Sequence, residues 1–155
     1  MDEFGGCVGV VPVLNPAVRG LCCRPYPNHP HGCPNFSKKQ GCPPKAPMID
    51  KTLDLSKPVL AIYNRFNLGE HIERMRAKHP LWTDRQLRCC LYWQPGARKQ
   101  LKKRIRNHLQ IGMKVVGSPE AQGVDLTATM RSAGIELEWP PMKWAYQIVL
   151  AGVPK

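Results

Sequence analysis

Four cysteines and two histidines lie within residues 21–44, a segment in which Pro and Gly are frequent. Because this composition disfavours both a helix and a central strand, something else must organise the backbone. Thiolates and imidazoles are the ligands that a soft metal centre prefers. Cys33 and Cys42 are each preceded by Gly and followed by Pro, and a Cys-Pro step also occurs in the ligand runs of bacterial iron–sulfur proteins. The segment therefore predicts a metal centre, with a [4Fe–4S] cluster as the first expectation and zinc as the alternative.

The spacing of these cysteines favours a cluster over a single zinc ion. The expected thiolate ligands are Cys22 or Cys23, of which Cys23 is preferred, followed by Cys33 and Cys42. None of them forms the Cys-x-x-Cys pair of a zinc ribbon. Two alternatives remain for the fourth ligand. Either Cys89 or Cys90 closes the site from a later helix, or one iron stays open and acts as a Lewis acid.

The histidines are expected to contribute less to the metal. His29 and His31 lie in the cysteine-rich segment, and we interpret them as exposed or as hydrogen-bond donors, although a mixed Cys/His zinc site is the alternative. His71, His79 and His108 lie in charged, helical contexts. We therefore expect these three side chains at the surface.

The charge of the chain points to a polyanionic partner. The net charge is +12, and no acidic residue occurs between Asp84 and Glu120. This interval contains a helix, expected over residues 97–110, whose basic side chains are the candidate nucleic-acid contacts. They are Arg98, Lys99, Lys102, Lys103, Arg104 and Arg106. The alternative is a solvated basic face that keeps the protein in solution.

One carboxylate, Glu120, is a candidate for acid–base chemistry. It follows Ser118-Pro119, which predicts the start of a short helical turn. A carboxylate at this position is stabilised by the helix dipole, so Glu120 is either part of a cap or an acid/base group beside an open iron.

The remaining pattern predicts the elements that position these residues. An apolar run over 8–14, interrupted by Pro12, suggests an edge strand. Buried or half-buried strands are expected over residues 58–64, 113–116, 135–139 and 146–151. Helices are expected over 68–78 with Asn67 as N-cap, over 83–93, and over 97–110 after a break at Pro95-Gly96. A further helix, capped by Asp125, is expected to run through Ala133 and to end at Gly134.

This alternation indicates an α/β or α+β fold, with a small mixed sheet and packed helices in a single domain over residues 1–155. Its expected parts are the cysteine-rich segment 21–47, a basic helical segment 83–110 and a strand–helix–strand part 112–155. No apolar run approaches a membrane span and the start does not read as a secretory signal. A cytoplasmic location is therefore expected, where cysteines serve as ligands more often than in disulfides.

Two blocks of sequence resemble one family. The run Gly32-Cys-Pro-Asn-Phe-Ser, with Gly41-Cys-Pro-Pro44, resembles the Cys-Pro-x-Tyr-Gly and Cys-Pro-Pro signature of an uncharacterised prokaryotic family described as predicted metal-binding proteins. Residues 118–134 are similar to its Pro-Glu-Ala-x-Gly-Val-Asp block. The resemblance implies a metal, but no reaction. Members commonly carry a further cysteine cluster before the second block, whereas residues 112–117 contain no cysteine.

Three functions follow as hypotheses. The first is a [4Fe–4S] enzyme that acts on a nucleic acid or nucleotide at an open iron. The second is a metal-stabilised nucleic-acid-binding module without catalysis. The third is an electron-transfer or cluster-carrier protein whose basic face docks an acidic protein partner. The sequence contains no phosphate-binding P-loop, no dinucleotide-binding glycine motif and no hydrolase nucleophile elbow.

Overall fold

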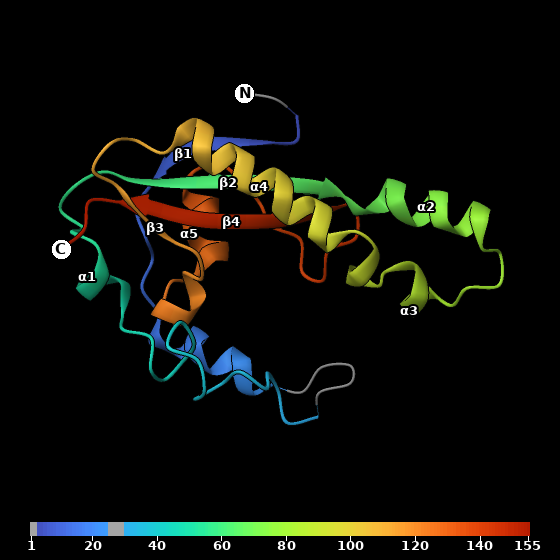
Figure 1. Cartoon of the computed structure of the whole chain (residues 1–155), viewed down its shortest axis with the longest axis horizontal. Helices are drawn as coiled ribbons and strands as arrows, with labels where there is room; N and C mark the ends of the chain where they lie inside the picture. Colours follow the sequence, from blue (N-terminus) through green and yellow to red (C-terminus); the bar gives the residue numbers. More distant parts are fainter. Residues whose placement is uncertain (1–2, 25–29) are drawn as a thin grey trace. The chain divides into compact units, whose positions relative to one another are not determined.

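The computed structural model describes residues 3–24 and 30–155, without the side chain of Cys22. Its helices and strands form an α+β fold, which confirms one of the two predicted classes (Figure 1). The chain separates into two compact units. The first unit holds residues 1–7, 62–109 and 136–148, and the second holds residues 8–61, 110–135 and 149–155.

A four-stranded sheet has the strand order β1-β2-β4-β3. The strands are β1 (Gly5–Val10), β2 (Val59–Asn67), β3 (Lys114–Val116) and β4 (Trp144–Gly152). β3 pairs antiparallel with β4, and Val115 lies opposite Ala151. Strands β1, β2 and β4 contribute residues to both units.

The first unit is built around the helices that follow β2. α2 (Leu68–Lys78) begins directly where β2 ends, and its N-cap is Asn67, whose side chain accepts a hydrogen bond from the Glu70 amide at 3.0 Å. This confirms both the predicted bounds and the predicted cap. α3 (Asp84–Leu87), the 3-10 turn η2 (Cys90–Tyr92) and α4 (Gln94–His108) complete the unit. Leu68, Ile72 and Leu87 form the centre of its apolar cluster.

The second unit has its own buried core. It contains the 3-10 helix η1 (Pro16–Cys23), α1 (Ile49–Thr52), the 3-10 turn η3 (Glu120–Gln122) and α5 (Leu126–Ser132). The largest fully buried side chains of this unit include Ile49, Leu53, Met130 and Leu150. Asp125 caps α5 by accepting a hydrogen bond from the Ala128 amide at 3.0 Å, as predicted.

Three sequence-based expectations about the elements are wrong. Residues 83–93 do not form one helix, because the chain leaves α3 at Arg88 and the backbone angles of Cys89 (φ −58°, ψ 120°) are not helical. Pro95 and Gly96 do not break the next helix, because Pro occupies its first turn, where no amide hydrogen bond is lost.

Residues 135–139 form no strand. The Glu138 carboxylate instead accepts hydrogen bonds from the backbone amides of Met142, Lys143 and Trp144 at 2.9–3.3 Å, which closes a turn there. Among the described residues, none of the helices combines the length and the apolar composition that a membrane crossing requires.

Candidate functional site

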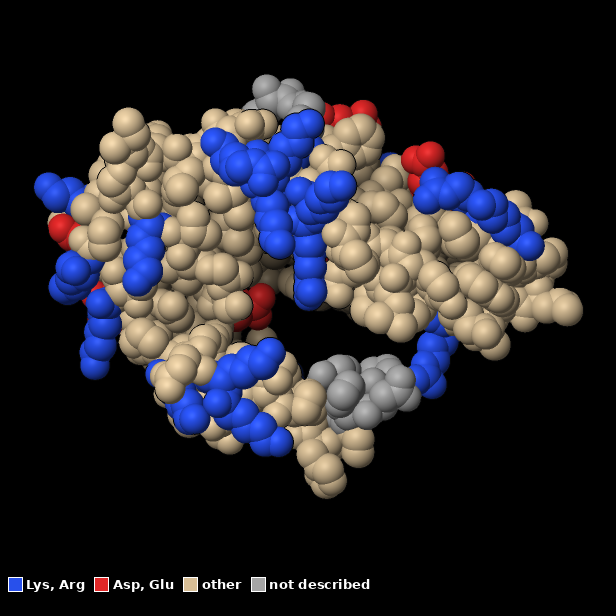
Figure 2. All heavy atoms as spheres, viewed as in Figure 1, with Lys and Arg blue, Asp and Glu red and all other residues tan. Residues whose placement is uncertain are grey.

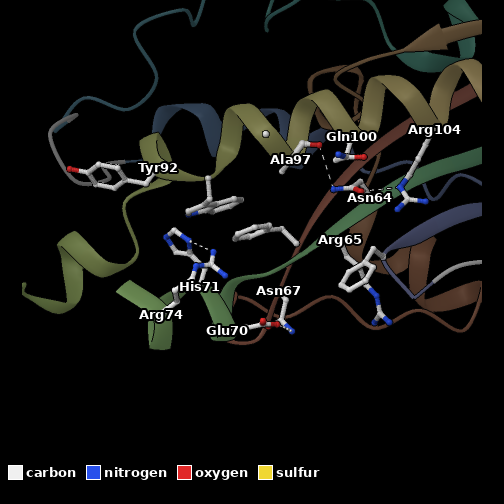
Figure 3. Close-up of a pocket in the computed structure, with 14 residues that line it drawn as sticks. Asn64, Arg65, Asn67, Glu70, His71, Arg74, Tyr92, Ala97, Gln100 and Arg104 are labelled. Atoms are coloured by element: carbon white, nitrogen blue, oxygen red, sulfur yellow. Dashed lines mark hydrogen bonds between the residues drawn. The ribbon is translucent and has the colours of Figure 1, made fainter. Parts of the chain in front are cut away.

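A pocket with a volume of about 550 Å³ lies entirely in the first unit (Figure 3). Its walls come from β1, β2, α2, η2 and α4, and combine aromatic rings with amide and cationic side chains. The lining residues are Phe4, Asn64, Arg65, Phe66, Asn67, Glu70, His71, Arg74, Tyr92, Trp93, Gly96, Ala97, Gln100 and Arg104. Three arginines against one glutamate make the lining electropositive by two charges when His71 is neutral.

α4 supplies one wall of the pocket through residues spaced at about one helical turn. Ala97, Gln100 and Arg104 face the pocket at positions i, i+3 and i+7. The same helix lies across β2 in the first unit (Figure 1). Sequence analysis placed Arg104 with the other basic residues of this helix, but its side chain is only half exposed and lies on the pocket side.

A buried asparagine fixes the position of Arg104. Asn64 is 4% exposed and donates hydrogen bonds to the Gln147 side chain at 2.9 Å and to the Ala97 carbonyl at 3.4 Å. Its own amide oxygen accepts from Arg104 Nε at 2.9 Å (Figure 3). Because both ends of this amide are satisfied, Asn64 ties β2 to α4 and holds the guanidinium at one place on the pocket wall.

Gly5 makes room for the same guanidinium. A Cβ atom at Gly5 would meet the Tyr63 carbonyl oxygen and would lie 2.6 Å from Arg104 Nε. The φ angle of Gly5 is +152°, a conformation that favours glycine. The absence of a side chain at this position therefore allows Arg104 to pack on β1.

Two stacked aromatic rings form the opposite part of the lining. Phe66 and Trp93 lie parallel, with ring centroids 4.9 Å apart and planes only 1° from each other. The indole Nε1 of Trp93 donates to the Arg88 carbonyl at 3.4 Å, which orients the ring. Both residues also pack against the apolar cluster of the first unit, so this aromatic wall is part of the structure and does not depend on a ligand.

His71 is the most unusual group in the pocket lining. It is 2% exposed, so the expected surface position is wrong. Its Nδ1 lies 3.5 Å from Arg74 Nη2, and because arginine only donates, Nδ1 is the acceptor and the proton lies on Nε2. That Nε2 is buried and has no hydrogen-bond partner among the described residues.

The environment of His71 disfavours the charged form of its imidazole. Burial, and then the positive charge of Arg74, lower the pKa of His71 from its ordinary value. A neutral imidazole with an unused N–H is a hydrogen-bond donor that costs free energy until an acceptor reaches it. Spacing could have revealed the buried position, because His71 shares a helix face with Leu68, Ile72 and Met75.

The opposite face of α4 is exposed and basic. Lys/Arg side chains gather over this helix in Figure 2. The exposed basic residues predicted as nucleic-acid contacts are Arg98, Lys99, Lys102, Lys103 and Arg106. Four of them, at 99, 102, 103 and 106, repeat at i, i+3, i+4 and i+7, which places them on one stripe of the helix.

The cysteine-rich segment belongs to the second unit and is organised by turns. The amide of Phe36 donates to the Cys33 carbonyl at 3.2 Å, and the Ala46 amide donates to the Cys42 carbonyl at 2.9 Å. The Arg19 guanidinium donates to the carbonyls of Pro44 and Ala46. Cys33 lies in a shallow hollow of about 370 Å³ beside His31 and Phe36.

The described thiols do not converge. Cys23 and Cys90 are exposed, Cys33 and Cys42 are half-buried, and none of these forms a disulfide. Within residues 3–24 and 30–155, no three His, Cys, Asp or Glu side chains come together as a metal site. The chemistry of the donors fits a cluster, whereas their described positions do not gather them. Cys22 and His29 lie outside the described side chains.

Glu120 is half-buried in η3 of the second unit. Burial, and then repulsion from Asp125, raise the pKa of its carboxyl group. This shift suits a proton donor or acceptor, and the described residues bring no cysteine cluster to it. The predicted acid/base role therefore stays a prediction.

Comparison with known proteins identifies no relative. No family model, no curated protein and no solved structure matches the chain.

Proposed function

We propose that this protein binds nucleic acid through α4. The observation that carries the proposal is the exposed basic stripe of Lys99, Lys102, Lys103 and Arg106 on a helix whose other face lines an aromatic, electropositive pocket. Phosphate contacts are made by exposed Lys and Arg side chains, so a single-sign stripe of this kind fits a sugar–phosphate backbone.

The distribution of acidic residues supports the same partner. α4 contains no Asp or Glu, so its lysines and arginines have no carboxylate on their own helix to pair with. Cations of one sign along about four helical turns create a local positive potential that attracts a polyanion, and binding releases the counterions of that polyanion. Affinity is therefore expected to fall steeply as salt rises.

The direct test removes part of the stripe. The triple variant Lys102→Ala, Lys103→Ala, Arg106→Ala should lose about tenfold to hundredfold in affinity for a fluorescently labelled single-stranded oligonucleotide. The slope of log affinity against log salt should fall by about 2 to 3, because roughly three phosphate contacts are lost. Fluorescence anisotropy measures both quantities.

A charge-matched control separates the stripe from net charge. Lys51, Lys57 and Lys155 are exposed and belong to the second unit, and their triple Ala variant loses the same +3. Equal losses of affinity in the two triple variants would overturn the proposal, as would an oligonucleotide affinity that salt does not change.

A metal at the cysteine-rich segment is a second proposal. We infer that Cys22 or Cys23, of which Cys23 is preferred, holds a [4Fe–4S] cluster together with Cys33 and Cys42, with zinc as the alternative. The support comes from donor chemistry, since Cys23, Cys33 and Cys42 carry free thiols that are exposed or half-buried, and from the resemblance of the Cys-Pro motifs to a predicted metal-binding family. When bound, the cluster would supply redox or Lewis-acid chemistry.

A further inference from the structure

The pocket beside α4 has the composition of a nucleotide site. It offers aromatic faces, cations and amide groups within about 550 Å³, a volume typical of small-molecule sites. We propose that it takes one unstacked nucleotide of a single-stranded nucleic acid, while the outer stripe of α4 holds the neighbouring phosphates. This inference rests on the proposed function and names its substrate class.

The first argument is the buried, unpartnered donor. His71 Nε2 has no hydrogen-bond acceptor among the described residues, although the ring is 2% exposed and lines the pocket. The other ring nitrogen, Nδ1, already lies 3.5 Å from Arg74 Nη2. An acceptor on the edge of a base, such as a carbonyl oxygen or a ring nitrogen, would satisfy the donor.

The second argument is the aromatic lining. Phe66 and Trp93 already stack on one another, and Tyr92, which is 59% exposed, adds a further ring at the edge of the pocket (Figure 3). Bases in single strands stack on exposed aromatic faces, whereas bases inside a duplex are not available for such contacts. This lining therefore favours a single strand over a duplex.

The third argument is the position of charge. Arg74, on α2, is exposed at the pocket, and Arg104, on α4, is held on the pocket wall by Asn64. Gln100, also on α4, lies between these two arginines along the pocket (Figure 3). Arginines bind phosphate oxygens, and a glutamine reads the donors and acceptors of a base edge. Because Gln100 and Lys99 are adjacent on α4, a strand whose base enters the pocket can continue along the basic stripe.

The first measurement compares strands with and without bases. The wild-type chain should bind a labelled single strand about tenfold more tightly than a strand of the same length made of abasic sites, and should favour the single strand over its duplex. Stacking of one base supplies a change of this size. The fluorescence anisotropy titrations use one salt concentration throughout.

The second measurement places a charge in the pocket. Gln100→Glu should lower affinity for the base-bearing strand about tenfold more than Gln110→Glu. The control places the same charge two residues after the end of α4 and outside the pocket lining. Gln100 is exposed, so this variant does not depend on repacking the core. Arg74→Gln and Arg76→Gln form a second matched pair on α2, and only the first should weaken binding.

The third measurement addresses His71 itself. His71→Phe keeps an aromatic ring at this position and removes both ring nitrogens, including Nε2–H, so the preference for base-bearing over abasic strands should fall while the salt slope stays unchanged. His79→Phe is the control, because His79 is exposed and lies outside the pocket lining. Circular dichroism and urea unfolding show whether each variant is folded.

The outcomes separate the two proposals. If abasic and base-bearing strands bind equally and both Gln variants behave alike, the nucleotide pocket is overturned, while a loss in the α4 triple variant still supports nucleic-acid binding. If no oligonucleotide binds, the proposed function fails. The pocket is then tested with adenosine, guanosine, cytidine and uridine 5′-monophosphates by NMR, and absence of shifts at residues 64–74 and 92–104 overturns it too.

Discussion

The pocket of the first unit and the cysteine-rich segment of the second are organised by different interactions. The pocket is built by β2, α2 and α4, whose side chains hold each other through the Asn64 hydrogen bonds and the Phe66–Trp93 stack. The cysteine-rich segment is held by local turns and by the Arg19 guanidinium. A binding site made by packing exists before its ligand arrives, whereas one made of turns depends on the ligand to gather its donors.

This contrast predicts where a ligand contributes most to stability. A metal bound by the cysteines would add folding free energy, because the unfolded chain holds no preformed site. A nucleotide in the pocket would mainly satisfy one donor and cover existing aromatic faces.

The largest expected effect is the loss of metal from the cysteine-rich segment. Cys33→Ser and Cys42→Ser should each abolish bound iron and sulfide in protein purified without oxygen, where the wild type holds about four of each. Metal analysis, an acid-labile sulfide assay and the visible spectrum measure this. Cys7→Ser is the matched control, because burial raises the pKa of the Cys7 thiol and disfavours the thiolate that ligates a metal.

One zinc per chain without sulfide would replace the cluster with the zinc alternative. Iron content unchanged in both variants would remove these two cysteines from the ligand set. The same samples should retain the nucleic-acid affinity of the α4 stripe, because Lys99 to Arg106 belong to the first unit.

Removing a phenylalanine from each region should have unequal effects on stability. Phe66→Ala loses the stack on Trp93 and part of the apolar cluster, so it should lower the free energy of unfolding by about 2–4 kcal/mol. Phe36→Ala, in the cysteine-rich segment, should lower it by less than about 1 kcal/mol in metal-free protein. Urea unfolding followed by circular dichroism checks both values, and equal losses would break the comparison.

Gly5 tests whether the pocket wall tolerates a side chain. Gly5→Ala should cost about 1–3 kcal/mol, because Gly5 has a positive φ and its new Cβ would meet the Tyr63 carbonyl and the Arg104 side chain. Gly9→Ala on the same strand should be nearly neutral, since nothing lies within 4 Å of a Cβ there. The variant should also displace Arg104, so nucleotide-dependent NMR shifts at residue 104 should weaken.

Local signals predicted most elements that depend on neighbours in sequence. α2 has the expected bounds because Asn67 caps it and the chain turns at His79 before Pro80. The strand expected from the alternation in residues 135–139 does not form, because the Glu138 carboxylate accepts hydrogen bonds from three backbone amides of its own turn. In addition, Pro140 and Pro141 have no amide hydrogen to donate to a neighbouring strand. The helix over 83–93 failed where the Trp93 indole bonds to the Arg88 carbonyl, a contact that no periodicity shows.

The candidate sites show a similar division. The basic stripe of α4 was readable because its residues are consecutive in one helix. The pocket was missed because Asn64, His71 and Arg104 come from three elements and become neighbours only after folding. The cysteines were conspicuous by composition, yet composition alone says nothing of how turns place them. His71 was the avoidable error, since its spacing from Leu68 and Ile72 already marked the inner face of α2.

The smallest expected effect is an opposite response of the two units to pH. Glu120, in the second unit, has a pKa raised above its ordinary value of 4.5 by burial and then by Asp125. At pH values between 4.5 and the raised pKa of the folded chain, the folded chain binds more protons than the unfolded chain. The stabilising contribution of Glu120 is therefore present below pH 4.5 and is lost as pH rises through the pKa of the folded chain. Glu120→Gln should therefore remove a loss of stability that accompanies rising pH.

His71, in the first unit, should respond in the other direction. Burial and then Arg74 lower its pKa below 6.5, and the other charged side chains that line the pocket are Arg65, Glu70 and Arg104. Below pH 6.5 the unfolded chain binds the additional proton, so stability is present above that pH and falls as pH drops through the folded pKa. Urea unfolding at pH 4.5–8 should show a smaller acid loss in His71→Phe than in wild type. If the dependence of the unfolding free energy on acid pH were the same in that variant as in wild type, His71 would not be held neutral in the folded chain. The pocket would then offer a base a charged imidazolium in place of a neutral N–H donor.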